Sequence, residues 1–171
     1  NVAPVLLSAL WRPALSAPLT RLPWIAPVRL FAWLAKRSVR LPQLIIGNNV
    51  DVGWLSGISV GTRIILEDDV RLGGRNSLFG YSGHAMDPEL RAQGFPDDDD
   101  KVGDIILERG VWLGTGAVVT ANVRIGAGTV VGANSVVTKD LPAGVIAGGI
   151  PAKVIRNIHD NATAPIPTND D

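Results

Sequence analysis

Aliphatic residues recur at every sixth position along the second half of the chain. Six consecutive segments between residues 107 and 142 each begin with one, and they read LERGVW, LGTGAV, VTANVR, IGAGTV, VGANSV and VTKDLP. A period of six matches neither an α-helix, which repeats every 3.6 residues, nor a strand whose two sides simply alternate. The pattern predicts a solenoid with three segments in each triangular coil, whose short strands meet at corners rich in glycine, asparagine and aspartate.

The first half of the chain carries the same period less regularly. Further segments begin at six aliphatic positions, with a slip of two residues before the third: Ile46, Val52, Val60, Leu66, Leu72 and Leu78. We expect the residue that opens each segment to point inward and to stack on its counterpart 18 residues away. Ile125 would then lie above Leu107, and Val131 above Leu113.

The period breaks between Leu78 and Leu107, which are 29 residues apart. The sequence between them is too polar for a coil wall, so we expect a loop over about residues 79–104. His84, one of only two histidines in the chain, lies on this loop. Because long loops on rigid scaffolds commonly carry functional residues, His84 is a candidate for chemistry rather than a merely solvated side chain.

Other polar residues of the loop have structural interpretations. We expect Asp87, Glu89 and Arg91 to order it through local ion pairs. The acidic run DDDDK, residues 97–101, resembles a protease recognition tag, but its position inside the loop favours a native, solvated segment.

The composition narrows the kind of core and excludes some chemistry. Of the 171 residues, 46% are hydrophobic but only 5% are aromatic, so valine, isoleucine, leucine and alanine must build the core. The 19 glycines suit many tight corners. There is no cysteine, which excludes disulfides and thiolate metal sites. The formal net charge is zero.

Residues 1–41 differ from the rest of the chain. They are rich in tryptophan and proline, and six basic residues precede Asp51, the first acidic residue. No apolar run here reaches the roughly 18–20 residues that span a bilayer, and no charged segment precedes the apolar start as in a secretory signal. On a helix, Arg29, Lys36 and Arg40 would share one face, opposite an apolar face. This segment is predicted to be helical, and either to contact an anionic membrane surface or to cover the open end of the first coil. At the other end, residues 159–171 are expected to be disordered.

Several motifs together resemble one family, the hexapeptide-repeat O-acetyltransferases. They are the repeats themselves, GHAMDPELRAQG around His84, GVWLGTGAVV, and VGANSVVTKDLPAGVIAGGIPAKVIR. The similarity is greatest to maltose and galactoside acetyltransferases and to acetyltransferases of bacterial polysaccharide synthesis, and it covers about residues 42–158. It implies an all-β fold: a left-handed parallel β-helix with a protruding loop. It also implies a homotrimer with active sites between subunits, and acetyl-CoA as the acyl donor.

The resemblance assigns His84 as the general base, with Ala85 where the family usually has proline. Acetyl transfer to a hydroxyl requires loss of the hydroxyl proton, and an imidazole suits this because its ordinary pKa of about 6.5 leaves it mostly neutral at pH 7. The N–H of Thr115 or of its neighbour Gly114 would stabilise the oxyanion. The residues that would hold acetyl-CoA are Trp112 beside its arm, Gly132 and Ala133 along the pantetheine, Thr138 and Lys139 near the adenosine, and Lys153 and Arg156 at the phosphates.

The acceptor remains open. A sugar hydroxyl, on a polysaccharide or its precursor, is the leading hypothesis; an amine, serine or an antibiotic on the same fold is an alternative, and so is an inactive structural β-helix. Zinc enzymes of the carbonic anhydrase type on this scaffold need three histidines, and the chain has two. We therefore expect no metal. We also expect no nucleic-acid partner. The expected location is the cytoplasm, with contact at the inner membrane if the N-terminal segment binds lipid.

Overall fold

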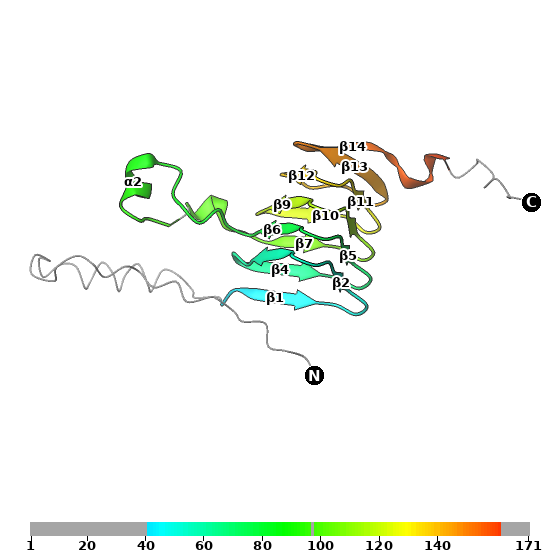
Figure 1. Ribbon diagram of the computed structural model, residues 1–171, viewed down its shortest axis with the longest axis horizontal. Helices are drawn as coiled ribbons and strands as arrows, with labels where there is room; N and C mark the ends of the chain where they lie inside the picture. The colour runs from blue at the N-terminus through cyan, green and yellow to red at the C-terminus, as the bar shows by residue number, and fades with distance from the viewer. Residues whose placement is uncertain (1–40, 97, 162–171) are drawn as a thin grey trace, which may run out of the picture. The chain divides into compact units, whose positions relative to one another are not determined.

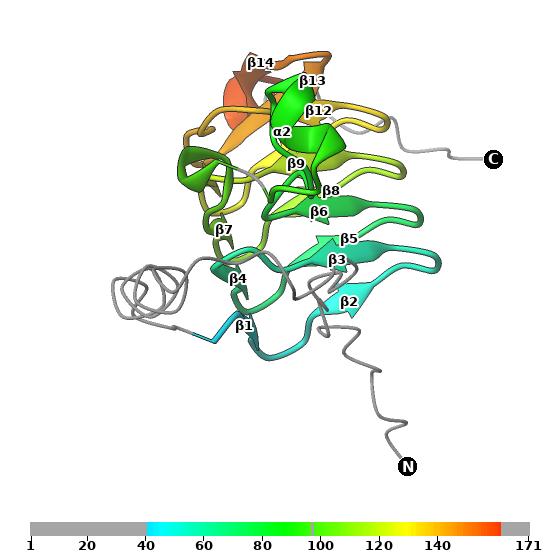
Figure 2. The ribbon, with the colours of Figure 1, turned by 90° about the vertical axis from the view of Figure 1, so that its left-hand side faces the viewer.

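The computed structural model describes residues 41–96 and 98–161 of the chain. These residues form a left-handed parallel β-helix, which confirms the predicted fold class. Each coil runs through three sheets in turn, named A, B and C here, and each sheet stacks one short strand from every coil (Figures 1 and 2). The predicted helical segment in residues 1–40 and most of the predicted disordered tail, residues 162–171, lie outside the described residues.

The strands are short because each hexapeptide supplies only one side of a triangular coil. Sheet A contains β1 (Gln43–Ile46), β4 (Arg63–Leu66), β7 (Ile105–Leu107) and β10 (Val123–Ile125). Sheet B contains β2 (Asp51–Val52), β5 (Arg71–Leu72), β8 (Trp112–Leu113), β11 (Val130–Val131), β13 (Val145–Gly149) and β14 (Ala152–Asn157). Sheet C contains β3 (Gly57–Ser59), β6 (Ser77–Phe79), β9 (Val118–Thr120) and β12 (Val136–Val137).

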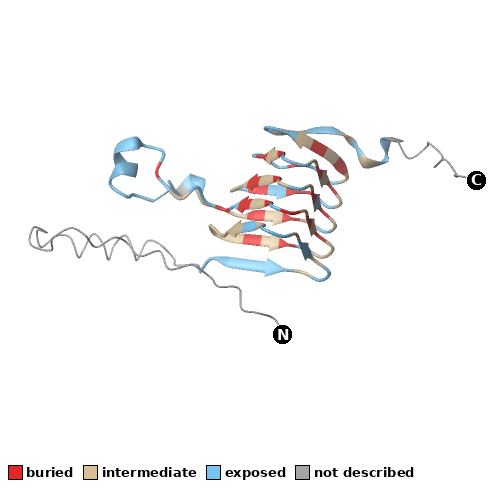
Figure 3. Cartoon of the chain, in the orientation of Figure 1, coloured by how far each residue is buried: buried red, intermediate tan, exposed pale blue. Residues whose placement is uncertain are grey.

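The residues that open the six regular segments fill the centre of the coils. All are at most 1% exposed: Leu107, Leu113, Val119, Ile125, Val131 and Val137. Ile125 pairs in register with Leu107 and Val131 with Leu113, so the predicted stacking at 18-residue spacing is confirmed. Figure 3 shows these buried positions as bands that continue from coil to coil. The core is therefore a set of aliphatic columns, each position packing on the coils before and after it.

The predicted alignment of the first coil is wrong at Val60. Leu78 pairs with Ile58, 20 residues earlier, and Val60 lies in the turn that leads from sheet C to sheet A. The two extra residues are absorbed in this turn, where Val60 packs half-buried against the core. Gly61 is needed there because a Cβ at this position would lie 1.9 Å from the carbonyl oxygen of Gly80.

The break in the period is a loop that leaves the stack between β6 and β7, residues 80–104, which we call the excursion. Strand β6 ends at Phe79 and β7 begins at Ile105, yet the two coils stay in register, since Leu66 pairs with Leu107. The excursion carries the short helix α2 (Pro88–Ala92) and a 3₁₀ turn, η2 (Asp99–Lys101), and it extends away from the coils (Figure 1).

The two ends of the described stack differ. Strand β1 is exposed along its whole length (Figure 3). At the other end β14 folds back antiparallel on β13 and is followed by η3 (Ile158–Asn161). None of the described helices has the length and apolar character needed to cross a membrane.

Candidate functional site

His84 is exposed and lies near the start of the excursion, between Gly83 and Ala85. Gly83 before it has φ of +97°, a conformation that residues with a Cβ rarely adopt. Ala85 after it is 2% exposed, and its N–H donates to the carbonyl of Phe95 at 3.4 Å. A proline, which the resemblance leads one to expect at position 85, has no N–H and could not make this bond.

Helix α2 orders the loop by hydrogen bonds to backbone rather than by the expected ion pairs. Asp87 caps the helix, because one of its carboxylate oxygens accepts from the N–H groups of Glu89 and Leu90 at 2.8 and 2.9 Å. Arg91 donates to the carbonyls of Ala85 and Met86, both at 3.0 Å. The guanidinium thus ties the helix to the two residues that directly follow His84. In the acidic run, Lys101 pairs with Asp100 at 2.7 Å, and both side chains are exposed to solvent.

The turns between sheets B and C bring four of the predicted site residues into contact. We call this edge the B/C corner; its turns are stacked one above another along the helix axis (Figure 2). A Cβ on Gly114 would lie 2.6 Å from the nitrogen of Ala133 and 3.0 Å from the carbonyl carbon of Gly132. Only glycine permits this backbone approach, which places Gly114 and Thr115 directly below Gly132 and Ala133.

The two predicted oxyanion donors differ in their hydrogen bonds. The Gly114 N–H donates to the carbonyl of Val131 at 2.7 Å, as part of the coil-to-coil ladder. Thr115 accepts at its carbonyl from the N–H of Asn134, while its own N–H has no acceptor within the described part of the chain. Of the two, the Thr115 N–H is the one left for a ligand.

The other predicted cofactor residues are spread over neighbouring strands and turns. Trp112 is on β8, 53% exposed, and pairs in register with Val130 of the next coil. Thr138 and Lys139 are exposed in the turn after β12, at the corner between sheets C and A, the C/A corner. Lys153 is exposed on β14. Arg156, on the same strand, is half-buried and donates to the carbonyls of Asn157 and Ile158 at 3.0 and 3.3 Å.

The predicted base and the predicted oxyanion donors therefore lie at two different corners of one chain. Gly114, Thr115, Gly132 and Ala133 line the B/C corner, whereas the excursion with His84 leaves the stack between β6 of sheet C and β7 of sheet A. In Figure 2 the excursion and the stacked B/C turns lie on separate edges.

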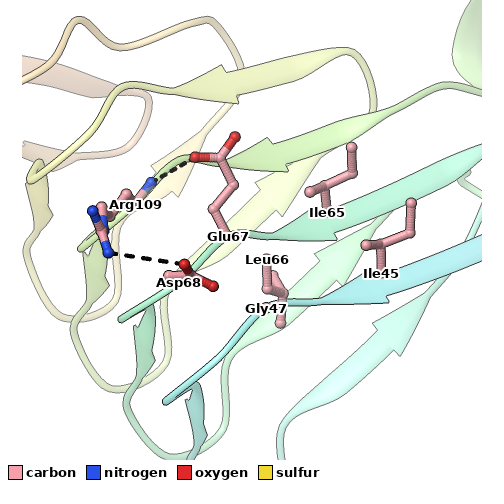
Figure 4. A pocket seen from close by; sticks show the side chains of 7 residues that line it. All are labelled: Ile45, Gly47, Ile65, Leu66, Glu67, Asp68 and Arg109. Carbon is pink, nitrogen blue, oxygen red and sulfur yellow. Dashed lines mark hydrogen bonds and ion pairs between the residues drawn. The ribbon is translucent and has the colours of Figure 1, made fainter.

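A hollow of about 340 Å³ lies away from these residues, next to the corner between sheets A and B. Ile45 and Ile65 project on one side of it, and Arg109 lies on the other with Glu67 and Asp68 (Figure 4). The N–H of Arg109 donates to Glu67 at 3.0 Å, and its side chain pairs with Asp68 at 3.8 Å. The charged groups here are engaged with one another, and none of the predicted site residues lines the hollow.

No group of three histidine or acidic side chains in residues 41–96 and 98–161 is arranged to hold a metal ion.

Comparison with known proteins finds similarity to acetyltransferases. The family of bacterial transferase hexapeptide repeats (six repeats) matches residues 104–139. A galactoside O-acetyltransferase of Lactococcus lactis is 37% identical over 122 residues, covering 67% of this chain and 56% of the relative. The chain thus spans little more than half the length of this relative.

Solved structures similar to this one are also acetyltransferases. A hexapeptide-repeat acetyltransferase of Vibrio cholerae, complexed with acetyl coenzyme A, superposes with a TM-score of 0.62 at 31% identity, over 68% of this chain and 61% of the other. A maltose O-acetyltransferase of Clostridium difficile gives a TM-score of 0.58 at 28% identity, over 67% and 58% of the two chains. The chain thus carries the repeats of the bacterial transferase hexapeptide family and is similar over about two thirds of its length to acetyltransferases with such repeats.

Proposed function

We propose that the protein is an acetyl-CoA-dependent O-acetyltransferase that acts on a hydroxyl of a sugar or polysaccharide precursor, with His84 as the general base. The observation that carries this proposal is the excursion, which interrupts an otherwise regular stack and presents an exposed histidine on a loop that Asp87 and Arg91 order through the backbone. The relatives named for galactoside and maltose support a sugar acceptor, and the Vibrio structure supports the donor.

His84 would take the proton from the acceptor hydroxyl as the oxygen attacks. Acetyl-CoA supplies a thioester, whose carbon–sulfur bond breaks as the new ester bond forms; CoA leaves as the thiol, with the proton that His84 accepted. The thioester oxygen gains negative charge in the transition state, and the Thr115 N–H is preorganised to donate to it because the rigid B/C corner fixes its direction.

The donor would run along the B/C corner, where Gly132 leaves room. A Cβ at Gly132 would meet its nearest neighbours at 3.6 Å, an ordinary contact distance, so this position is less crowded than Gly114. Trp112 offers an exposed ring on the same coil as Thr115. Lys139 and Lys153 are exposed cations suited to phosphates, while the guanidinium of Arg156 is held by backbone carbonyls and would act as a fixed charge.

A complete site would need two chains. His84 belongs to an excursion at the C/A corner and Thr115 to the B/C corner, so the C/A corner of one subunit must meet the B/C corner of its neighbour. A closed homotrimer forms three such head-to-tail contacts.

The test is the His84→Ala variant, assayed for acetyl transfer from acetyl-CoA to a panel of sugars and oligosaccharides with mass-spectrometric detection of the product. Removal of a general base lowers turnover by roughly 10²–10⁴-fold. The matched control is His159→Ala, which removes the chain's other histidine from the exposed turn η3 and is expected to leave turnover unchanged. A His84→Ala variant as active as the control would refute the assignment, and product found only on amines would move the acceptor to the N-acetyltransferase class.

A further inference from the structure

The first two turns of the B/C corner carry an exposed group of large side chains, which we call the Trp54 ledge: Trp54, Leu55 and Arg75. Trp54 is 66% exposed and Leu55 77% exposed, both in the turn between β2 and β3. Arg75 lies in the equivalent turn of the next coil, where its N–H donates to the carbonyl of Trp54 at 2.8 Å. Neither Trp54 nor Arg75 has a role in the core.

The backbone of the ledge is in an unfavourable conformation. Six residues other than glycine have positive φ within the described chain, and four of them are asparagine or aspartate, which tolerate it. The other two are Leu55 at +56° and Arg75 at +60°. The equivalent positions of the next two coils are Gly116 and Asn134. Large side chains are thus kept at two positions where a smaller residue would relieve strain, which points to a use for them.

The Arg75 guanidinium differs from other arginines of the stack in its partners. Arg63, Arg109 and Arg124 each form an ion pair with a carboxylate, and Arg71 donates to the carbonyls of Asn49 and Val70. Arg75 has no carboxylate partner among the described residues, and lies instead 5.7 Å from the centre of the Trp54 ring. The indole is also held from the next coil, since a Cβ at Gly74 would lie 2.8 Å from its nitrogen. The ledge therefore presents a fixed aromatic surface beside an uncompensated positive charge.

The Trp54 ledge lies in the two turns that precede the turn of Thr115, the proposed oxyanion donor, along the same B/C corner. A Cβ on Gly73 would lie 2.7 Å from the nitrogen of Thr115, so the turn of Arg75 packs directly against the turn of Thr115. Trp54 is two coils from Thr115, or roughly 10 Å at the usual spacing of parallel strands. A sugar ring stacked on Trp54 would leave a hydroxyl of the same or the next ring within reach of Thr115.

We propose that the Trp54 ledge is an acceptor subsite for an anionic sugar unit, with the apolar face of the ring on Trp54 and a carboxylate or phosphate group on Arg75. This inference rests on the proposed function and deepens it by naming the acceptor class. A ring of this kind offers carbon–hydrogen bonds to the indole and an anion to a guanidinium that binds such groups in pairs of hydrogen bonds.

Measuring turnover with three disaccharides tests whether the acceptor must be anionic. They are cellobiose, cellobiouronic acid and cellobiose 1-phosphate. The native protein should use an anionic disaccharide with a lower KM than cellobiose, and the better of the two anions identifies the source of the charge. Arg75→Met should raise KM for that substrate about tenfold or more, whereas Arg75→Lys, which has the same backbone strain and keeps the charge, should retain much of the preference. Arg109→Met, at the A/B corner, is the control and should leave the preference intact. Equal KM values for all three disaccharides, or an unchanged preference in Arg75→Met, would overturn the proposal.

Direct binding separates failure of this inference from failure of the proposed function. Saturation-transfer NMR without acetyl-CoA should detect methyl β-D-glucuronide or glucose 1-phosphate on the native protein, but not on Trp54→Ala, and should detect methyl β-D-glucoside only weakly. If no sugar is acetylated, the proposed function fails and the binding experiment alone decides the ledge. Binding of neither anionic sugar would then overturn the subsite.

Discussion

At the scale of single residues, Glu108 joins two coils through its carboxylate. It accepts from Arg124 at 2.7 Å and from the N–H of Ala127 at 3.0 Å, both in the following coil. The hydrogen bond from Arg124, and next that from Ala127, hold the pKa of the Glu108 carboxyl below its ordinary value of 4.5. Because the folded protein binds this proton less readily than the unfolded chain, the ionised carboxylate stabilises the fold above about pH 4.5. This contribution is lost as the pH falls through the lowered pKa.

Glu108→Gln is therefore expected to lower the unfolding temperature at pH 7, and to lower it less at pH 3. A loss of roughly 1 kcal/mol corresponds to about 2–4 °C in a chain of this size. Thermal unfolding followed by circular dichroism at both pH values measures it. The control is Glu89→Gln, on the excursion, which should change neither value. An equal deficit at pH 3 and pH 7 would mean that side-chain shape, rather than charge, is what the coil requires.

At the scale of elements, helix α2 depends on its cap because it has only five residues. Asp87→Ala removes the acceptor for two N–H groups and should loosen the loop that holds His84. Since the excursion lies outside the coil stack, we expect kcat to fall severalfold to about tenfold while the unfolding temperature and the KM for acetyl-CoA stay unchanged.

Asp87→Asn supplies the decisive comparison, since asparagine caps helices as well as aspartate does. It should restore kcat to near the native value. If it is as impaired as Asp87→Ala, the carboxylate charge, not the helix cap, would be what Asp87 contributes.

The coil walls could be predicted from the sequence because inward positions repeat at a fixed spacing. Leu107, Leu113 and Ile125 follow that rule, and the structure stacks them as expected. Val60 does not, because an extra pair of residues can be absorbed in a turn without disturbing the strands on either side. The spacing alone cannot tell an aliphatic residue in a strand from one that packs at a corner.

The candidate site was predictable only in part, for a similar reason. The motif around His84 and the glycines of the B/C corner are local in sequence, and the packing of Gly114 against Ala133 follows from the 18-residue stacking. The hydrogen bonds of Arg91 to Ala85 and Met86 depend on how the loop turns back on itself, which a row of charged residues does not specify. The strain at Leu55 and Arg75 likewise becomes visible only when equivalent turns are compared across coils.

At the scale of the whole molecule, the decisive feature is the separation of His84 from Thr115 at two corners of the stack. Our proposal joins them between neighbouring subunits, so two defects in different chains should complement each other. His84→Ala removes the base. Gly132→Leu should block the donor without unfolding the coil, because the nearest atom to a Cβ there is 3.6 Å away.

Each variant alone should form an inactive homotrimer. When the two are co-expressed in equal amounts, random assembly gives a site with one intact loop and one intact corner about one time in four. Purification by two different affinity tags, checked by native mass spectrometry, removes the inactive homotrimers. Each mixed trimer then holds one complete site out of its three interfaces, so it should regain about a third of the native turnover. Recovery requires that a loop from one chain serve the corner of another. Mixed trimers that stay inactive, while each variant remains folded, would instead confine the site to a single chain, and His84 would then have to reach Thr115 across its own sheet C.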